Sequence, residues 1–74
     1  MSFTVPYTDH QMEVDTQRRV VMLYFNAWNR DSSGTPDETY SFEVLRQDRA
    51  LMATLTGMLA GSDAAELERL VAGS

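Results

Sequence analysis

The stretch that decides the fold is residues 38–46, which read E-T-Y-S-F-E-V-L-R. Apolar and polar side chains alternate along it, and a period of two residues is typical of a half-buried β-strand. The alternation places Tyr40, Phe42 and Val44 on an apolar face. Thr39, Ser41 and Glu43 make up the opposite, polar face. We therefore predict a strand here, with the apolar face turned toward the core.

A second strand is predicted immediately upstream. Residues 19–28 read R-V-V-M-L-Y-F-N-A-W, a run rich in β-branched and aromatic residues that is apolar on both faces. A buried helix capped by Asp15 or Thr16 remains the alternative. The strand is favoured because residues 29–37, N-R-D-S-S-G-T-P-D, have the composition of a turn that joins two antiparallel strands.

The flanking segments differ in their periodicity. In residues 1–18, Phe3, Val5 and Tyr7 alternate, and so do Met12 and Val14, while Pro6 favours an edge strand or an extended arm. Beyond the hairpin the period becomes helical. The first predicted helix begins at a cap, Asp48, ends at Gly61, and carries an apolar stripe made of Leu51, Met52, Leu55, Met58 and Leu59. The second begins with Asp63 and Glu66 at the spacing of a capping box, and its apolar stripe is made of Ala64, Leu67, Leu70 and Val71.

These patterns together predict a small α+β fold in one domain, residues 1–74. A β-hairpin at 19–46 forms an antiparallel sheet, with residues 1–18 as an N-terminal arm or a third, edge strand. A helical hairpin at 48–73 packs on one face of this sheet. Three strands covered by a helix pair would be stable alone, whereas the hairpin by itself would not.

Composition excludes several classes of protein. The 74 residues contain 11 acidic and 6 basic side chains, a net charge of −5, so that nucleic-acid phosphates would repel the molecule. The absence of cysteine rules out disulfides and thiolate metal sites. No secretory signal and no apolar run of roughly 18 residues is present, which predicts a soluble, cytoplasmic protein without a membrane partner.

The sequence carries no catalytic or cofactor motif. His10 is the sole histidine, and the nearby carboxylates of Asp9, Glu13 and Asp15 would hold a metal weakly with it. The loop that begins at Asp31 spaces oxygen-bearing residues like part of a calcium loop, but Phe42 stands where the bidentate Glu is required. We therefore expect no enzyme activity, no metal and no cofactor.

An uncovered apolar face is the main indication of function. If the core face of the hairpin is as predicted, Val20, Met22, Tyr24 and Trp28 lie on the opposite face and require a cover, from the N-terminal segment, a second copy or a partner protein. We expect a protein-binding module, an adaptor or a small acidic inhibitor with a basic partner. The expected contact residues are Met22, Tyr24, Trp28, Asp31, Asp37, Glu38 and Glu43.

Two alternatives to this interpretation stay open. The same apolar face would serve a homodimer or a larger assembly of identical subunits. Alternatively, the chain is a phage-type inhibitor of nucleic-acid machinery, whose carboxylates imitate phosphates. Acidic residues gathered on one face would favour that second alternative, and scattered ones would count against it.

Overall fold

The chain forms a β-sheet with a layer of helices beneath it in a computed structural model that describes residues 2–7, 10–26 and 28–73. For residues 2–7, 10, 30 and 31 the description covers the backbone only. The elements of the described residues follow one another in the order β1 (Ser2–Tyr7), β2 (His10–Asp15), β3 (Val20–Tyr24), a π-helical turn η1 (Asn29–Ser33), β4 (Glu38–Ser41), α1 (Phe42–Gln47), α2 (Arg49–Gly57) and α3 (Ser62–Ala72).

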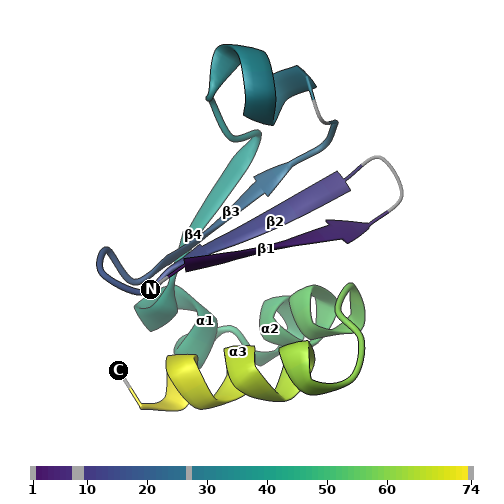
Figure 1. Cartoon of the computed structure of the whole chain (residues 1–74). Coiled ribbons are helices and arrows are strands. Elements are labelled where there is room, and N and C mark those ends of the chain that lie inside the picture. Colours follow the sequence, from purple (N-terminus) through teal and green to yellow (C-terminus); the bar gives the residue numbers. More distant parts are fainter. Residues whose placement is uncertain (1, 8–9, 27, 74) are drawn as a thin grey trace.

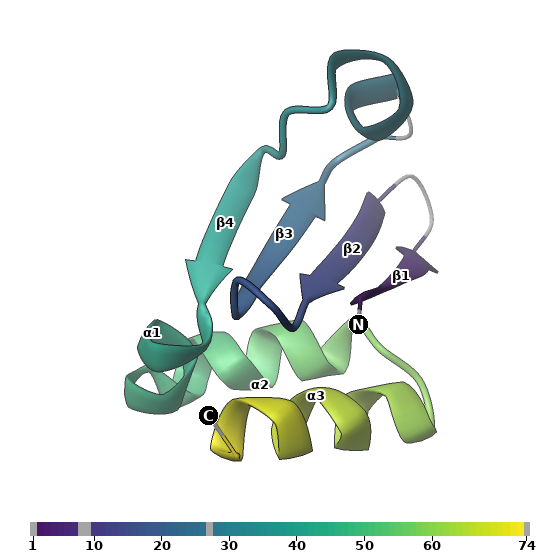
Figure 2. The same ribbon diagram turned by 60° about the vertical axis from the view of Figure 1, so that its left-hand side comes forward.

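The four strands form an antiparallel meander in the order β1-β2-β3-β4. Val21 of β3 lies opposite Val14 of β2 and Tyr40 of β4, and Leu23 lies opposite Met12. These alternate residues share one face of the sheet, and all three helices pack against that face (Figure 2). The period of two in the sequence therefore identifies the inner face of β3 correctly.

The predicted α+β class is confirmed, with a larger sheet than the minimal prediction. Residues 1–18 do not form a single arm: β1 and β2 pair with each other as a hairpin, and β2 also pairs with β3. Residues 20–24 are a strand, so the helical alternative for 19–28 is wrong. The strand is shorter than predicted, because it ends at Tyr24.

The prediction that the next strand continues to residue 46 is also wrong. The backbone is extended at Ser41, and the Ser41 hydroxyl oxygen accepts a hydrogen bond of 3.1 Å from the Val44 N–H, which makes Ser41 the N-cap of α1. On this helix Phe42 and Leu45 are buried, while Val44 is 46% exposed. Residues three positions apart share a helical face, so Val44 points to solvent and Leu45 replaces it in the core.

The predicted helical hairpin is present. Asp48 accepts a hydrogen bond of 3.0 Å from Leu51 N–H and caps α2, as expected. The helix ends at Gly57, before the predicted terminator Gly61, which instead precedes α3 with a φ of +57°. The predicted capping box does not form: α3 begins at Ser62 without a side-chain cap, and Glu66 binds Arg69.

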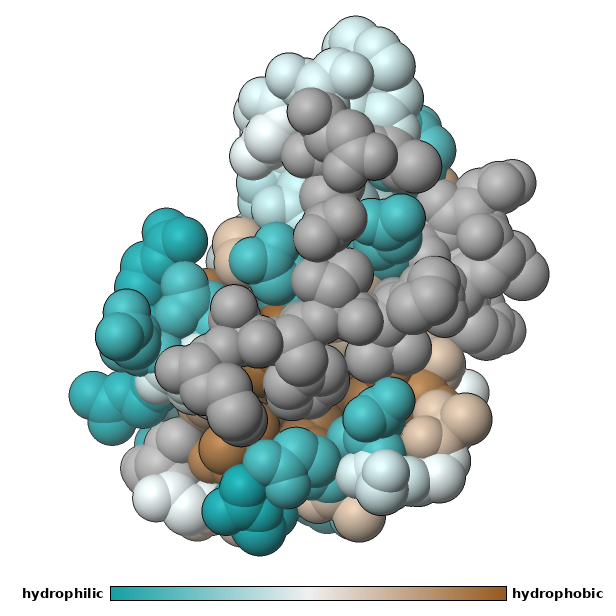
Figure 3. Space-filling view, viewed as in Figure 1, coloured by the Kyte–Doolittle hydropathy of each residue, from teal (hydrophilic) through white to brown (hydrophobic). Residues whose placement is uncertain are grey.

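The core lies between the sheet and the helices. Hydrophobic residues reach the surface at the boundary between these two layers (Figure 3). Both predicted helical stripes face it. Its buried side chains are Met12, Val14, Val21, Leu23, Phe42, Leu45, Met52, Leu55, Leu67 and Val71. Among the described residues, no helix combines the length and the apolar character that crossing a bilayer requires.

Candidate protein-docking site

The connection between β3 and β4, residues 25–37, projects beyond one end of the sheet (Figures 1 and 2). We call it the β3–β4 excursion. It contains η1 and lies at the opposite end of the strands from α1. The core between the sheet and the helices does not extend to it, so its conformation must come from its own hydrogen bonds.

Asp37 closes the base of the excursion. Its carboxylate accepts a hydrogen bond of 2.8 Å from the Phe25 N–H and another of 2.8 Å from the Asn29 side-chain amide. The Asp37 N–H itself donates to the Leu23 carbonyl at 2.8 Å. Because the Phe25 N–H is bonded to a side chain instead of to a neighbouring strand, the chain leaves the sheet there.

The tip of the excursion is a single turn held by Asn29. The Asn29 N–H donates to the Asn26 side-chain oxygen at 2.8 Å, and the Asn29 carbonyl accepts from the Ser33 hydroxyl and the Gly34 N–H, each at 2.8 Å. Gly34 ends the turn at a φ of +68°, a conformation that costs glycine little. The excursion is thus an ordered structure whose hydrogen bonds come mainly from its own residues.

Two large apolar side chains stand exposed on this braced segment. Trp28, directly before η1, is 65% exposed, and Phe25 is 42% exposed. Burial of a large apolar side chain stabilises by about 1.5–3 kcal/mol, and this chain gains only part of that for Phe25 and a smaller part for Trp28. An ordered segment that presents Trp and Phe to water is typical of a protein contact surface.

Met22 and Tyr24 do not share that surface. They alternate with the inward-facing Val21 and Leu23, so they lie on the sheet face turned away from the helices. They are nevertheless only 7% and 5% exposed, and the Tyr24 hydroxyl lies 3.9 Å from the Met22 sulfur. Both are covered within a single chain. The face expected to join them with Trp28 is divided, because β3 ends at Tyr24.

The acidic residues expected at the contact surface do not form one group among the described side chains. Asp37 is bonded within the base of the excursion, and Glu38 follows it at the start of β4, where its hydrogen bond raises the pKa of the Tyr40 hydroxyl. Glu43 lies on α1, at the far end of the sheet. The side chain of Asp31 is outside the described residues.

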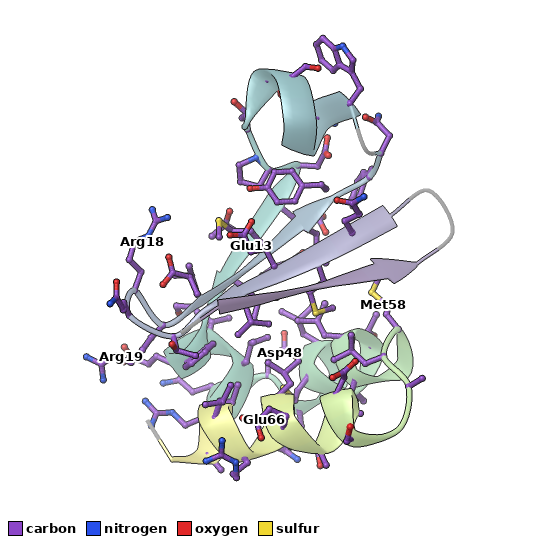
Figure 4. All side chains as sticks on the ribbon, in the orientation of Figure 1. Glu13, Arg18, Arg19, Asp48, Met58 and Glu66 are labelled. Atoms are coloured by element: carbon purple, nitrogen blue, oxygen red, sulfur yellow. The ribbon has the colours of Figure 1, made fainter. Side chains whose placement is uncertain are left out.

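The remaining acidic side chains are also dispersed. Glu13 lies on the sheet face away from the helices, while Asp48 and Glu66 lie among the helices (Figure 4). A phosphate-imitating surface would need carboxylates gathered on one face. The distribution of the described acidic residues therefore does not support that alternative.

A metal site requires several His, Cys, Asp or Glu side chains close together. No group of three or more such residues in the described part of the chain is arranged to hold a metal ion. The side chain of His10 is outside the described residues, so the expectation that it takes part in no metal or catalytic site stays a prediction.

Sequence reasoning missed Phe25 as a surface residue. The period of two along residues 19–28 places Phe25 on the same face as Val21 and Leu23, which is the core face. The signal in the sequence is the set of polar side chains that follow it: Asp37 accepts a hydrogen bond from the Phe25 N–H, and Asn26 accepts one from the Asn29 N–H.

Comparisons with known proteins add no function to this site. No protein-family model matches the chain. No characterised protein sequence and no solved structure matches it either.

Proposed function

We propose that this chain is a non-catalytic protein-binding module that docks onto a partner protein through the β3–β4 excursion, with Trp28 as the main anchor. The observation that supports this most strongly is the exposure of Trp28 on a hydrogen-bonded segment. Tryptophan is among the residues most enriched at the energetic centres of protein interfaces. Phe25 supplies a second apolar contact nearby in the sequence.

The bracing of the excursion favours binding energetically. A flexible loop loses conformational entropy when it docks, and that loss weakens the complex. Here the hydrogen bonds of Asp37 and Asn29 fix the segment before binding. The partner therefore meets a preformed surface, so more of the free energy of burying Trp28 contributes to affinity.

The charge of the chain indicates the chemistry of the partner. With a net charge of −5, the molecule attracts basic proteins at long range and repels acidic ones. The exposed Glu38 at the base of the excursion adds a local negative charge. The partner we infer has an apolar pocket for Trp28 and basic residues around that pocket.

The test begins with identification of the partner by site-specific photo-crosslinking. A crosslinking side chain replaces Ser32, an exposed residue of η1, in one variant that keeps Trp28, and Val44 in the control variant, which labels an exposed apolar position on α1. A protein captured from position 32 and not from position 44 is then purified. Its affinity is measured for the unmodified chain, for Trp28→Ala and for Val44→Ala.

We expect Trp28→Ala to weaken binding by about thirtyfold, the effect of removing a residue that contributes about 2 kcal/mol. Val44→Ala should bind like the wild type, and both variants should unfold at the wild-type denaturant concentration. Unchanged binding by Trp28→Ala would refute the proposal. So would a concentration-dependent dimer, seen by light scattering, that Trp28→Ala dissociates, because Trp28 would then lie at a self-interface.

A further inference from the structure

A hollow of about 260 Å³ lies at the end of the sheet opposite to the β3–β4 excursion. It is formed where the β2–β3 turn meets the junction of β4 and α1. Its lining residues are Arg18, Arg19, Ser41, Phe42, Glu43 and Arg46. We call it the arginine pocket.

The β2–β3 turn is organised so that two arginines follow each other at its surface. Asp15 accepts hydrogen bonds from the Gln17 and Arg18 N–H groups at 3.0 and 3.1 Å, and from Arg18 Nε at 2.9 Å. Figure 4 shows Arg18 and Arg19 extending outward from this turn. Arg18 uses Nε for Asp15 and retains the N–H donors of its two terminal nitrogens.

Arg19 connects the turn to the other wall of the arginine pocket. Its backbone φ of +57° is left-handed, which is uncommon for a residue other than glycine, asparagine or aspartate. In this conformation its carbonyl accepts a hydrogen bond of 2.9 Å from the Phe42 N–H. The Arg19 guanidinium makes no hydrogen bond or ion pair with the described residues.

The charge of the arginine pocket is opposite to that of the molecule. Half of the six arginines line it, against a single lining carboxylate, Glu43, in a chain of net charge −5. Asp15, paired with Arg18 beside the lining, adds a second negative charge. Three lining guanidinium groups thus stand against two carboxylates, Glu43 and Asp15, so this set of residues attracts an anion although the net charge of the molecule repels it.

We propose that the arginine pocket binds the phosphate group of a phosphate monoester. Guanidinium groups match tetrahedral oxyanions, because their N–H donors form paired, charge-assisted hydrogen bonds with two oxygens. Arg19 supplies such donors beside the hollow, the Ser41 hydroxyl adds a neutral one, and Arg18, which extends in a different direction from Arg19 (Figure 4), and Arg46 add positive charge. The volume is below the usual range for drug-sized ligands, which suits one phosphate group and not a whole nucleotide.

This site is independent of the proposed docking of Trp28, from which it is separated by the length of the sheet. The test is a titration with inorganic phosphate at pH 7.5, followed by the backbone amide NMR signals of residues 18–20 and 41–46. Sodium chloride at equal ionic strength is the reference. Arg19→Gln is the test variant, and Arg49→Gln is its matched control, because it removes the same charge from outside the lining.

We expect saturable shifts in these two segments with phosphate and none with chloride. Arg19→Gln should weaken phosphate binding by at least about tenfold, the effect of losing a charge-assisted hydrogen bond. Glu43→Gln should strengthen it by about twofold to fivefold. Shifts that never saturate, that chloride reproduces, or that Arg49→Gln reduces as much as Arg19→Gln would overturn the proposal.

A second titration, with a short phosphoserine peptide, distinguishes the source of the phosphate. Tighter binding of the peptide than of inorganic phosphate would assign the site to phosphorylated protein segments. Equal affinities would assign it to small phosphate monoesters. An affinity of Arg19→Gln for the peptide equal to that of the wild type would contradict the proposal for either source.

Discussion

Two aspartates fix the two ends of β3, each by binding backbone N–H groups through its carboxylate. Asp15 holds the turn before the strand, and Asp37 holds the start of the excursion after it. Asp15 binds N–H groups of the β2–β3 turn, and Asp37 binds the N–H of the first residue after β3. Asp15 lies beside the arginine pocket, and Asp37 lies at the base of the β3–β4 excursion. Substitution of each aspartate therefore tests how the neighbouring site is held in place.

Replacement of Asp37 by alanine should loosen the excursion. The Phe25 N–H and the Asn29 side-chain amide would lose their acceptor, at a cost of about 1–2 kcal/mol in the free energy of unfolding. Amide hydrogen exchange should show faster exchange at Phe25, with unchanged protection in α2 and α3. Glu68→Ala, which removes an exposed carboxylate on α3, is the control. Wild-type exchange at Phe25 in the Asp37 variant would show that this hydrogen bond does not hold the excursion.

Asp15 should make the free energy of unfolding depend on pH in the acidic range. Its hydrogen bonds, first from the Arg18 backbone N–H and then from the Arg18 side chain, hold the pKa of Asp15 below the ordinary 3.8. A carboxyl group with a lowered folded-state pKa stabilises the fold above its unfolded pKa. That stabilisation is lost as the pH falls through the folded value.

Asp15→Asn keeps a side-chain oxygen for the turn but removes the charge. As the pH falls below 3.8, the wild type should therefore lose more stability than Asp15→Asn, measured by urea unfolding at each pH. Parallel acid profiles for the two proteins would mean that the Asp15 carboxylate contributes nothing to stability through its charge.

At the scale of the element, the informative place is the junction of β4 and α1. Residues 38–46 satisfy two periods at once: Tyr40, Phe42 and Val44 fit a strand, while Phe42 and Leu45 fit one face of a helix. The Ser41 cap decides between them, because its hydroxyl oxygen satisfies the Val44 N–H at the start of a helix. The change from strand to helix also brings Phe42 into the core.

A pair of alanine substitutions separates these two structures. Leu45 is fully buried, so Leu45→Ala should lower the free energy of unfolding by about 2–5 kcal/mol. Val44 is 46% exposed, so Val44→Ala should change it by less than about 0.5 kcal/mol. Chemical denaturation measures both. A continuous strand would reverse the order of the two effects.

Elements with a purely local signal were predictable from the sequence. The apolar stripe around Met52 and Leu55 and the cap at Asp48 depend on neighbours within two helical turns, and both are confirmed. The hairpin of β1 and β2 was not predicted in full, because its pairing depends on the register with β3. The end of β3 at Tyr24 was missed because it depends on the hydrogen bond between the Phe25 N–H and Asp37, which are twelve residues apart in the sequence.

For the whole molecule, the fold places its two candidate sites at opposite ends of the sheet. The sequence predicted Trp28 as a contact residue but grouped it with Met22 and Tyr24, which the chain itself covers. Arg18 and Arg19 come close to Arg46 only because the β2–β3 turn contacts the start of α1. No local sequence pattern predicts that contact. The charges predicted an acidic molecule but not the basic pocket within it.

Docking through the β3–β4 excursion requires Trp28 to be exposed in the free chain. Trp28 is the sole tryptophan, so the fluorescence of the protein reports on it alone. The decisive measurement is acrylamide quenching of this fluorescence in the folded chain over a wide range of protein concentration, compared with the urea-unfolded chain. We predict quenching close to that of the unfolded chain at every concentration, as a 65% exposed side chain requires. Strong protection of Trp28 from quenching in the isolated folded monomer would contradict the account.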